Sequence, residues 1–287
     1  VDEKGVFYGT RTILQILKQD DAHVNIPKGI TRDYPKYETR GLMLDVARKY
    51  YTIDFLRDYV KLLAWYKMNV FHIHLNEDIG GFRLESETYP GLAAEKHYTK
   101  QEFRDLVYLG MDYGVNIIPE IDTPGHSKAF IDYNPSLGRG SHLDISKPET
   151  VEFVKRLFDE YLDPENPTFV GPDVHIGTDE YSTSTQEDVE RFRAYVDDPI
   201  KYINSKGKRP HLWGGLKAYD GETPISNEAT MDYWAASQSG DPQLGLELGF
   251  DIVNILDTYL YIVPRAGYYR DYLDIKWLYN NWEPTVW

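Results

Sequence analysis

The chain has 287 residues, of which 41% are hydrophobic, which is enough for one large α/β domain or two modest ones. Its formal net charge of −15 argues against nucleic acid and anionic membrane as partners, because both bind clustered Lys and Arg. The absence of Cys excludes disulfides, thiolate metal sites and Cys nucleophiles. The sequence contains no apolar run of membrane-spanning length, so we expect no membrane insertion.

The first residues lack the basic and apolar blocks of a signal peptide, and the chain does not begin with Met. We interpret it as an excised domain, which leaves the presence of a leader open. Tyr and Trp are abundant, with 24 and 6 copies. Their apolar rings with polar groups suit a carbohydrate cleft, although ordinary core packing explains most of them.

Apolar strands alternate with amphipathic helices, a pattern typical of a parallel sheet covered by helices. A short helix is predicted at Gly9–Lys18, within a lead-in segment that covers residues 1–36. Strands are then predicted at Gly41–Val46, Val70–Leu75, Val115–Ile121, Val174–Gly177, Pro210–Trp213, Thr230–Tyr233 and Asp251–Ile255. The clearest helices between them are predicted at Ile53–Lys67, Lys100–Tyr113, Pro148–Leu162 and Gln186–Ser205.

Seven strand–helix units are one fewer than a closed (β/α)8 barrel needs. The fold predicted for residues 37–287 is therefore an α/β, TIM-type (β/α)8 barrel truncated before its eighth strand, which would need on the order of 30 more residues. Two alternatives are that the lead-in segment fills the gap, or that the sheet is not a closed barrel. No linker composition divides the chain further.

Polar and aromatic side chains gather where the predicted strands end, which is where TIM-type barrels carry their chemistry. They are Asp45 and Arg48 after strand one (with Arg40 at its start), His72 to Asp78 after strand two, Glu120 to His126 after strand three, Asp179 and Glu180 after strand four, Trp213 and Trp234 after strands five and six, and Asp257, Tyr259 and Tyr261 after strand seven.

Asp179 and Glu180 are the most informative of these residues. Neighbouring side chains of a strand point to opposite faces, so the two carboxylates can act on one ligand only where the backbone turns. Gly177 and Thr178 favour such a turn. Adjacent carboxylates are costly unless one is protonated or each has a partner, and enzymes use this to set an acid beside an anion. Taken alone, such a pair is more often a solvated loop.

Several stretches together make the chain resemble the catalytic domain of glycoside hydrolase family 20, the β-N-acetylhexosaminidases and their relatives. They occur in the family's order over nearly the whole chain. They are Arg40 to Arg48, Met68 to Leu75, Ile117 to Ser127, His175 to Glu180, and Tyr259-Leu260-Tyr261.

The resemblance implies substrate-assisted catalysis with retention, an exception to the scheme of two catalytic carboxylates. The acetamido carbonyl oxygen of the sugar attacks its own anomeric carbon and gives an oxazolinium ion. Asp179 would hold the acetamido N–H and stabilise the positive charge that develops there. Glu180 would protonate the leaving oxygen and then deprotonate the incoming water. No enzyme nucleophile, cofactor or metal is expected.

The resemblance also implies the substrate-binding residues. Arg40 would bind sugar hydroxyls, unless it forms an ion pair at the base of the barrel. Trp213 and Trp234 would wall the acetamido pocket, unless they are ordinary core. Tyr259 would donate its hydroxyl to the acetamido oxygen. The remaining candidates are Asp122 and Tyr261, the latter where many members carry Asp.

His126 and Glu77 would form a relay to Glu180, although many members carry Asp at the position of Glu77. His72, His74, Glu77 and Asp78 can also be read as metal ligands. However, His72 and His74 share one face of a strand, and such inward His residues are commonly hydrogen-bonded core, so we predict no metal. His175 is predicted to be structural.

Family members carry a Trp and an acidic residue on strand eight, and we do not take Trp282, Glu283 or Trp287 as substitutes. The predicted function is a retaining exo-β-N-acetylhexosaminidase that removes terminal β-linked GlcNAc or GalNAc from oligosaccharides or glycoconjugates. The alternatives are a lacto-N-biosidase and a catalytically dead barrel that binds carbohydrate. Arg83 to Leu92 resembles surface members of Gram-positive bacteria, so we expect an extracellular or cell-surface location.

Overall fold

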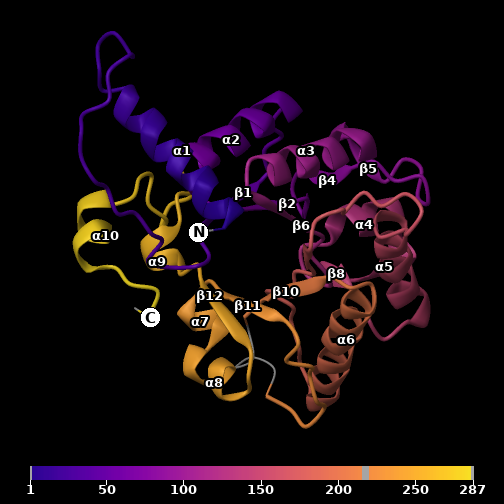
Figure 1. The fold of residues 1–287 in the computed structure, drawn as a ribbon. Coiled ribbons are helices and arrows are strands. Elements are labelled where there is room, and N and C mark those ends of the chain that lie inside the picture. The colour runs from indigo at the N-terminus through magenta and orange to yellow at the C-terminus, as the bar shows by residue number, and fades with distance from the viewer. Residues whose placement is uncertain (1, 215–219, 286–287) are drawn as a thin grey trace.

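The structure is a computed structural model and describes residues 2–214 and 220–285 (Figure 1). Its centre is one curled sheet of parallel strands, and all seven predicted strands are confirmed to within two residues. In spatial order they are β1 (Gly41–Asp45), β2 (Val70–His74), β6 (Asn116–Glu120), β9 (Asp173–His175), β10 (Arg209–Trp213), β11 (Thr230–Tyr233) and β12 (Asp251–Asn254).

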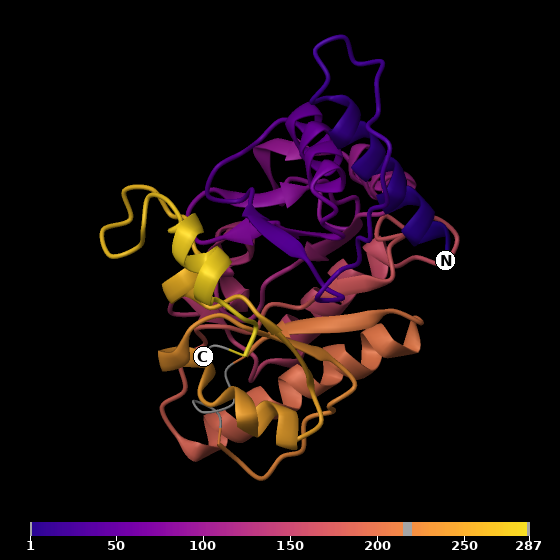
Figure 2. The same cartoon turned by 60° about the vertical axis from the view of Figure 1, so that its left-hand side comes forward.

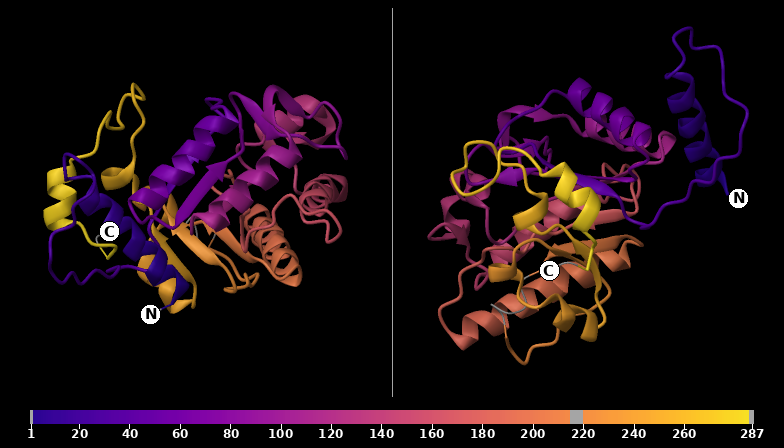
Figure 3. Two further views of the ribbon diagram at one scale, coloured as in Figure 1. Left: turned by 45° about the horizontal axis from the view of Figure 1, so that its top comes forward. Right: turned by 90° about the vertical axis from the view of Figure 1, so that its left-hand side faces the viewer.

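The four long helices predicted between the strands are also present, and they cover the outer face of the sheet (Figures 1 and 3). They are α2 (Ile53–Trp65), α3 (Lys100–Asp112), α5 (Pro148–Tyr161) and α6 (Gln186–Ser205). Thr99 and Glu102 form a capping box at the start of α3, which satisfies two backbone donors of its first turn. Buried residues of α2, such as Leu56 and Val60, join the core between helices and sheet.

Several short elements were not predicted. A three-stranded sheet of β3 (Asn76–Glu77), β4 (Gly81–Leu84) and β5 (Ala93–Tyr98) follows β2. Segments of two to seven residues are too short to show a hydrophobic period, which is why the pattern misses them. The others are α4 (Lys128–Tyr133), a 3-10 turn (Pro135–Leu137), β7 (Gly138–Arg139), β8 (His142–Leu143), α7 (Ala236–Ser239), α8 (Pro242–Glu247), α9 (Asp257–Leu260) and α10 (Ile275–Asn281).

The lead-in segment carries a longer helix than predicted. Helix α1 (Glu3–Leu17) begins six residues before the predicted start, and Asp2 caps it by accepting from the backbone N–H of Gly5. Figure 3 shows α1 outside the sheet, where Gln15 Nε2 donates to the carbonyl oxygen of Trp65 at 2.6 Å. The division of the chain at residue 36 stays a prediction.

The sheet is open between β12 and β1, which are not paired with each other in the described part of the chain. Figure 2 shows the curl from β1 (purple) to β12 (orange-yellow). The described residues thus supply seven strands of the predicted (β/α)8 barrel. The lead-in segment adds no strand among the described residues, so it does not fill the eighth position. Trp287 lies outside the described residues.

No helix among residues 2–214 and 220–285 combines the length and the apolar character that crossing a membrane requires.

Candidate active site

The backbone turns sharply after β9, and this turn carries Asp179 and Glu180. Gly177 has φ +74° and Thr178 has φ +91°, so both lie in the left-handed region that favours glycine. A Cβ on Gly177 would approach Oδ1 of Asp122 to 1.8 Å, so only glycine fits here. The turn that Gly177 and Thr178 were predicted to make is therefore present.

The turn brings both carboxylates to one imidazole. Nε2 of His126 lies 3.2 Å from Oε2 of Glu180 and 3.5 Å from Oδ2 of Asp179. The loop that carries His126 packs directly under the pair, because a Cβ on Gly125 would lie 2.6 Å from the carbonyl oxygen of Asp179. The adjacent residues Asp179 and Glu180 thus face the same imidazole, that of His126.

Backbone strain is concentrated at this site. His126 has φ +46° and Glu180 has φ +50°, in addition to Thr178 at +91°. A non-glycine residue in this region costs on the order of 1–3 kcal/mol and persists only where the surroundings enforce it, which is common at active sites.

Glu77 lies on the other side of the His126 ring. Nδ1 of His126 is 3.1 Å from Oε1 of Glu77 and 3.2 Å from Oε2. Burial opposes a charge on His126, but its hydrogen bonds to Asp179, Glu180 and Glu77 raise the pKa of His126 well above its ordinary value. The structure therefore brings together all four residues predicted as catalytic.

Arg48 also belongs to this group, and the sequence analysis did not select it as a candidate. Its guanidinium pairs with Glu77 and, at 2.6 Å, with Oδ2 of Asp45. About half of the Arg48 side chain is exposed, so it can meet a ligand. Its position after strand one was the available signal.

Arg40 does not lie in the site, and the prediction that it binds sugar hydroxyls is wrong. It precedes β1 and so lies at the opposite end of that strand. Its guanidinium donates to the carbonyl oxygens of Lys67 (2.9 Å), Tyr37 (2.7 Å) and Glu38 (2.9 Å). Nη2 of Arg40 also donates to the hydroxyl of Tyr8 in α1 at 3.1 Å, so Arg40 ties the lead-in segment to the base of the sheet through neutral oxygens rather than an ion pair.

Trp213 and Trp234 lie side by side in a small apolar cluster that also contains Ala235. Met43, Ile255 and Tyr261 pack against this cluster. Both indoles are buried, at 4% and 7% exposure, and Nε1 of Trp213 donates to Oε1 of Glu120 at 2.5 Å. The predicted juxtaposition of the two Trp residues is therefore present in the structure.

The structure places Tyr261, rather than Tyr259, against this cluster. Burial and the nearby charge of Asp179 raise the pKa of Tyr261 well above its ordinary value. The ring of Tyr259 instead stacks on Trp277 of α10, with centroids 4.9 Å apart. The role predicted for Tyr259 at the acetamido oxygen therefore does not agree with its position, and Tyr261 occupies the place expected for it.

Asp122 is fully buried, and its Oδ2 has no hydrogen-bond partner among the described residues, so its assignment as a substrate-binding residue stays a prediction. Its Oδ1 accepts the backbone N–H of Thr178 at 3.0 Å, which holds the turn after β9. Burial, with the charge of Asp179 close by, raises the pKa of Asp122 well above its ordinary value.

The inward His residues of β2 are part of the core, as predicted. Nε2 of His72 lies 2.9 Å from Oε2 of Glu120, and Nδ1 of His74 lies 2.6 Å from the same atom. Among the described residues, five sets of three His, Asp or Glu side chains are close enough to hold one cation, for example His72, His175 and Asp232. In each set a His already faces a carboxylate, and the absence of a metal stays a prediction.

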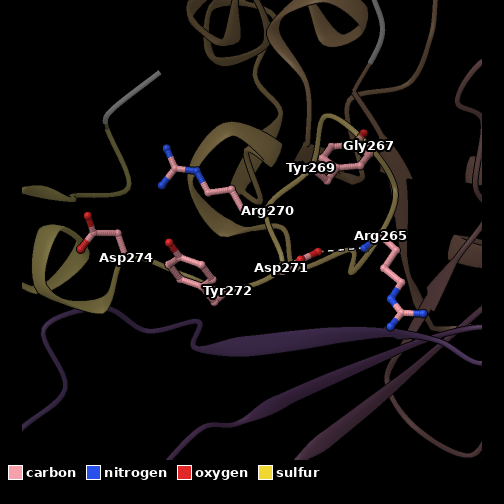
Figure 4. Close-up of a pocket in the computed structure, with 7 residues that line it drawn as sticks. All are labelled: Arg265, Gly267, Tyr269, Arg270, Asp271, Tyr272 and Asp274. Carbon is pink, nitrogen blue, oxygen red and sulfur yellow. Dashed lines mark hydrogen bonds between the residues drawn. The ribbon is translucent and has the colours of Figure 1, made fainter.

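A hollow of about 510 Å³ lies in the segment after α9. Figure 4 shows its lining, in which the backbone N–H of Arg265 donates to Oδ1 of Asp271 at 2.8 Å. Tyr269 links this segment to the site, because its ring centroid lies 5.6 Å from that of Tyr261.

Comparison with known proteins agrees with this geometry. The model of the glycosyl hydrolase family 20 catalytic domain matches residues 37–282. A lacto-N-biosidase of Bifidobacterium bifidum is 27% identical, with 96% of this chain and 26% of that protein covered. A beta-hexosaminidase of Porphyromonas gingivalis is 30% identical, with 82% of this chain and 36% of that protein covered.

A solved structure shares the fold over nearly the whole of this chain. The family 20 beta-N-acetylhexosaminidase of Streptomyces coelicolor superposes with a TM-score of 0.79 at 25% identity, covering 99% of this chain and 64% of that one. The chain thus spans between about a quarter and somewhat over half of the length of the first curated relatives it matches. Because the family model matches 246 of the 287 residues, the chain belongs to glycosyl hydrolase family 20.

Proposed function

We propose that the protein is a retaining exo-β-N-acetylhexosaminidase that removes terminal β-linked GlcNAc or GalNAc from oligosaccharides and glycoconjugates. The observation that carries this proposal is the state of the Asp179 carboxylate. One oxygen, Oδ2, faces His126, while Oδ1 is buried and has no hydrogen-bond partner among the described residues. A buried carboxylate oxygen needs a donor, and the N–H of a bound 2-acetamido group would supply one.

The chemistry follows from the two carboxylates. In the first step the acetamido oxygen forms a bond to C1 of the sugar, the C1–O bond to the leaving group breaks, and Glu180 gives its proton to the leaving oxygen. Asp179 stays an anion and stabilises the positive charge on the oxazolinium ring. In the second step water attacks C1, its proton passes to Glu180, and the bond to the acetamido oxygen breaks.

Burial supports different roles for the two residues. The Asp179 side chain is 14% exposed, whereas the Glu180 side chain is 45% exposed. Asp179 is thus enclosed, as a residue that holds the acetamido group needs to be. Glu180 is open enough to meet both a leaving group and an incoming water. Trp213, Trp234 and Tyr261 would form the wall of the acetamido pocket.

The first experiment compares hydrolysis of 4-nitrophenyl-β-N-acetylglucosaminide by the wild type, Asp179→Asn and Glu180→Gln. Glu187→Gln serves as a control, because it neutralises a carboxylate in the first turn of α6. We expect turnover in the wild type and the control and a loss of about 100-fold or more in both site variants. Equal activity in Asp179→Asn and the wild type would contradict substrate assistance.

A substrate panel separates the alternatives. Release of lacto-N-biose as a disaccharide, without release of GlcNAc, would favour the biosidase. Binding of an N-acetylglucosamine thiazoline without any turnover would favour a barrel that only binds carbohydrate. For location, we infer a bacterial extracellular or cell-surface protein, supported by the likeness of Arg83 to Leu92 to surface members of the family. Recovery of the protein only in the cytosolic fraction of its host would contradict this location.

A further inference from the structure

Glu120 is a fully buried carboxylate at the C-terminal end of β6, in the middle of the sheet, and the mechanism above does not use it. Its two oxygens receive donors from three sides. Oε1 accepts Nε1–H of Trp213 at 2.5 Å, while Oε2 lies 2.9 Å from Nε2 of His72 and 2.6 Å from Nδ1 of His74. A buried carboxylate is tolerated only with such a set of partners.

Two chains of contacts lead from Glu120 to the site, and each is called an arm below. The first arm runs through Trp213 to the wall of the proposed sugar pocket. The indole of Trp213 is held by its hydrogen bond to Glu120 and by the rings of His72 and His175, whose centroids lie 5.4 Å and 4.7 Å away. Trp213 also belongs to one apolar cluster with Trp234, and Tyr261 packs against that cluster. The orientation of Glu120 therefore fixes the orientation of this indole.

The other arm reaches the catalytic pair. Nε2 of His74 lies 3.5 Å from Oε1 of Glu77, which is an electrostatic contact rather than a hydrogen bond, and Glu77 in turn faces Nδ1 of His126 at 3.1 Å. The other ring nitrogen of His126, Nε2, contacts the carboxylate of Glu180. One buried carboxylate is thus connected to both sides of the site, by Trp213 on one side and by His74 on the other.

We propose that Glu120 is a positioning residue, which sets the Trp213 indole and, through His74 and Glu77, the His126 imidazole. The inference rests on the proposed function for its consequence in catalysis. Its structural content, that one buried carboxylate orders both groups, does not depend on turnover.

The chemistry of the contacts explains why a carboxylate is needed. Nε1 of Trp213 can only donate a hydrogen bond. Nε2 of His72 and Nδ1 of His74 both face the Glu120 carboxylate. Glutamine has the same shape but offers one acceptor oxygen and one NH2 group that only donates, so it cannot accept from all three partners. The change Glu120→Gln therefore breaks at least one arm, while Glu120→Asp keeps the charge and withdraws it by one methylene.

Asp232 offers a matched control. It is a buried carboxylate of β11, and it lies between His175 Nε2 (3.4 Å) and His211 Nδ1 (3.5 Å). No contact of its side chain with Trp213 or His74 is described among residues 2–214 and 220–285. Asp232→Asn thus disturbs the same buried interior, reaches the Trp213 arm only through the His175 ring, and leaves every hydrogen bond of Glu120 in place.

The experiment first records the indole N–H signals of the free enzyme by ¹H–¹⁵N NMR, with Trp213 assigned by its loss in Trp213→Phe. We expect the Trp213 signal and the ring ¹⁵N signals of His126 to move in Glu120→Gln and to stay in Asp232→Asn. In kinetics, we expect kcat/KM for chitobiose to fall about 100-fold in Glu120→Gln, the size typical of a misplaced site, with a smaller loss in Glu120→Asp. Asp232→Asn should stay within a few-fold of the wild type.

Unchanged Trp213 and His126 signals in Glu120→Gln, or equal kinetic losses in Glu120→Gln and Asp232→Asn, would overturn the inference. If Glu120→Gln does not fold, Trp213→Phe and His74→Gln cut one arm each, and each must lower kcat/KM on its own. Moved signals in an enzyme without turnover would reject the proposed function but keep the positioning. Unmoved Trp213 and His126 signals together with normal turnover in Glu120→Gln would reject the positioning but keep the function.

Discussion

His126 and Glu180 face each other across 3.2 Å, from Nε2 of the imidazole to Oε2 of the carboxylate. The opposite nitrogen of the same ring faces Glu77 at 3.1 Å. Because carboxylates lie at both nitrogens, the ring donates on both sides and stays protonated. His126 therefore fixes the place of the Glu180 carboxylate and supplies a positive charge next to it.

Replacing His126 by Asn removes both contacts. We expect the rate on chitobiose, whose leaving group needs a proton, to fall by about 100- to 10,000-fold, which is the usual contribution of acid–base catalysis. The rate on the 4-nitrophenyl substrate should fall less, because nitrophenolate leaves without a proton. His97→Asn is the control, since Nδ1 of His97 is paired with the carbonyl oxygen of Ala94 in β5. Equal losses on the two substrates would speak against a role in proton transfer.

Gly177 permits the turn that carries the catalytic pair, so Gly177→Ala should disturb both folding and activity. The left-handed φ alone costs about 1 kcal/mol for alanine, and the overlap of the new Cβ with Asp122 adds about 1–3 kcal/mol. Gly207→Ala is a matched control, because Gly207 has φ +71° and nothing within 4 Å of its added Cβ. Urea unfolding should show a larger loss for Gly177→Ala, with kcat reduced only in that variant. Equal losses of stability in Gly177→Ala and Gly207→Ala would mean that the turn after β9 shifts to accommodate the new Cβ.

Sequence patterns were sufficient for the strands and for the place of the site. The strands of a parallel sheet are buried on both faces, so they appear as short apolar runs with polar residues directly after them, as in β2 and β9. Because all carboxyl ends lie on one edge, His126, Asp179 and Glu180 were bound to meet there. The short strands β3 to β5 and the helices after β11 carry no such pattern.

The errors concern residues whose neighbours come from other elements. Arg40 and Arg48 lie at opposite ends of β1. The direction of the strand places Arg40 at the base of the sheet and Arg48 at the site. Tyr259 and Tyr261 are two residues apart, and α9 in place of an extended strand decides which one meets the indoles. Asp122 also accepts the backbone N–H of Thr178, a contact that the sequence did not predict. None of these contacts is visible in a local pattern.

The two arginines lead to opposite expectations. Arg40→Ala should lower stability by about 2–3 kcal/mol, because it leaves several backbone carbonyls without their charged donor, and kcat/KM should be retained. Arg48→Ala removes the cation paired with Glu77, so kcat/KM should fall about tenfold or more while the unfolding midpoint changes little. Thermal unfolding and kinetics on the same preparations test both. Loss of kcat/KM in a fully folded Arg40→Ala enzyme would restore Arg40 as a ligand contact.

Stability should fall as the pH rises from about 6.5 to 9, because of His211. Burial disfavours its charge, but the carboxylates of Asp173 and Asp232, each 3.5 Å from a ring nitrogen, outweigh burial and raise the pKa of His211 to about 9. In the unfolded chain a His has a pKa of about 6.5, so the folded state binds this proton more tightly. The stabilisation is fully present below pH 6.5 and is lost as the pH passes through 9. A difference of about 2.5 pH units corresponds to roughly 3 kcal/mol at most.

The measurement is the urea midpoint of unfolding at pH 6, 7.5 and 9. The wild type and His97→Asn should lose stability over this range. His211→Asn should be less stable at pH 6, because two buried carboxylates lose their shared cation, and its midpoint should change less with pH. A wild-type slope that persists in full in His211→Asn would assign the titration to other buried His residues. The first to test would be His74, paired with Glu120 and Glu77, and His126, paired with Glu77 and Glu180.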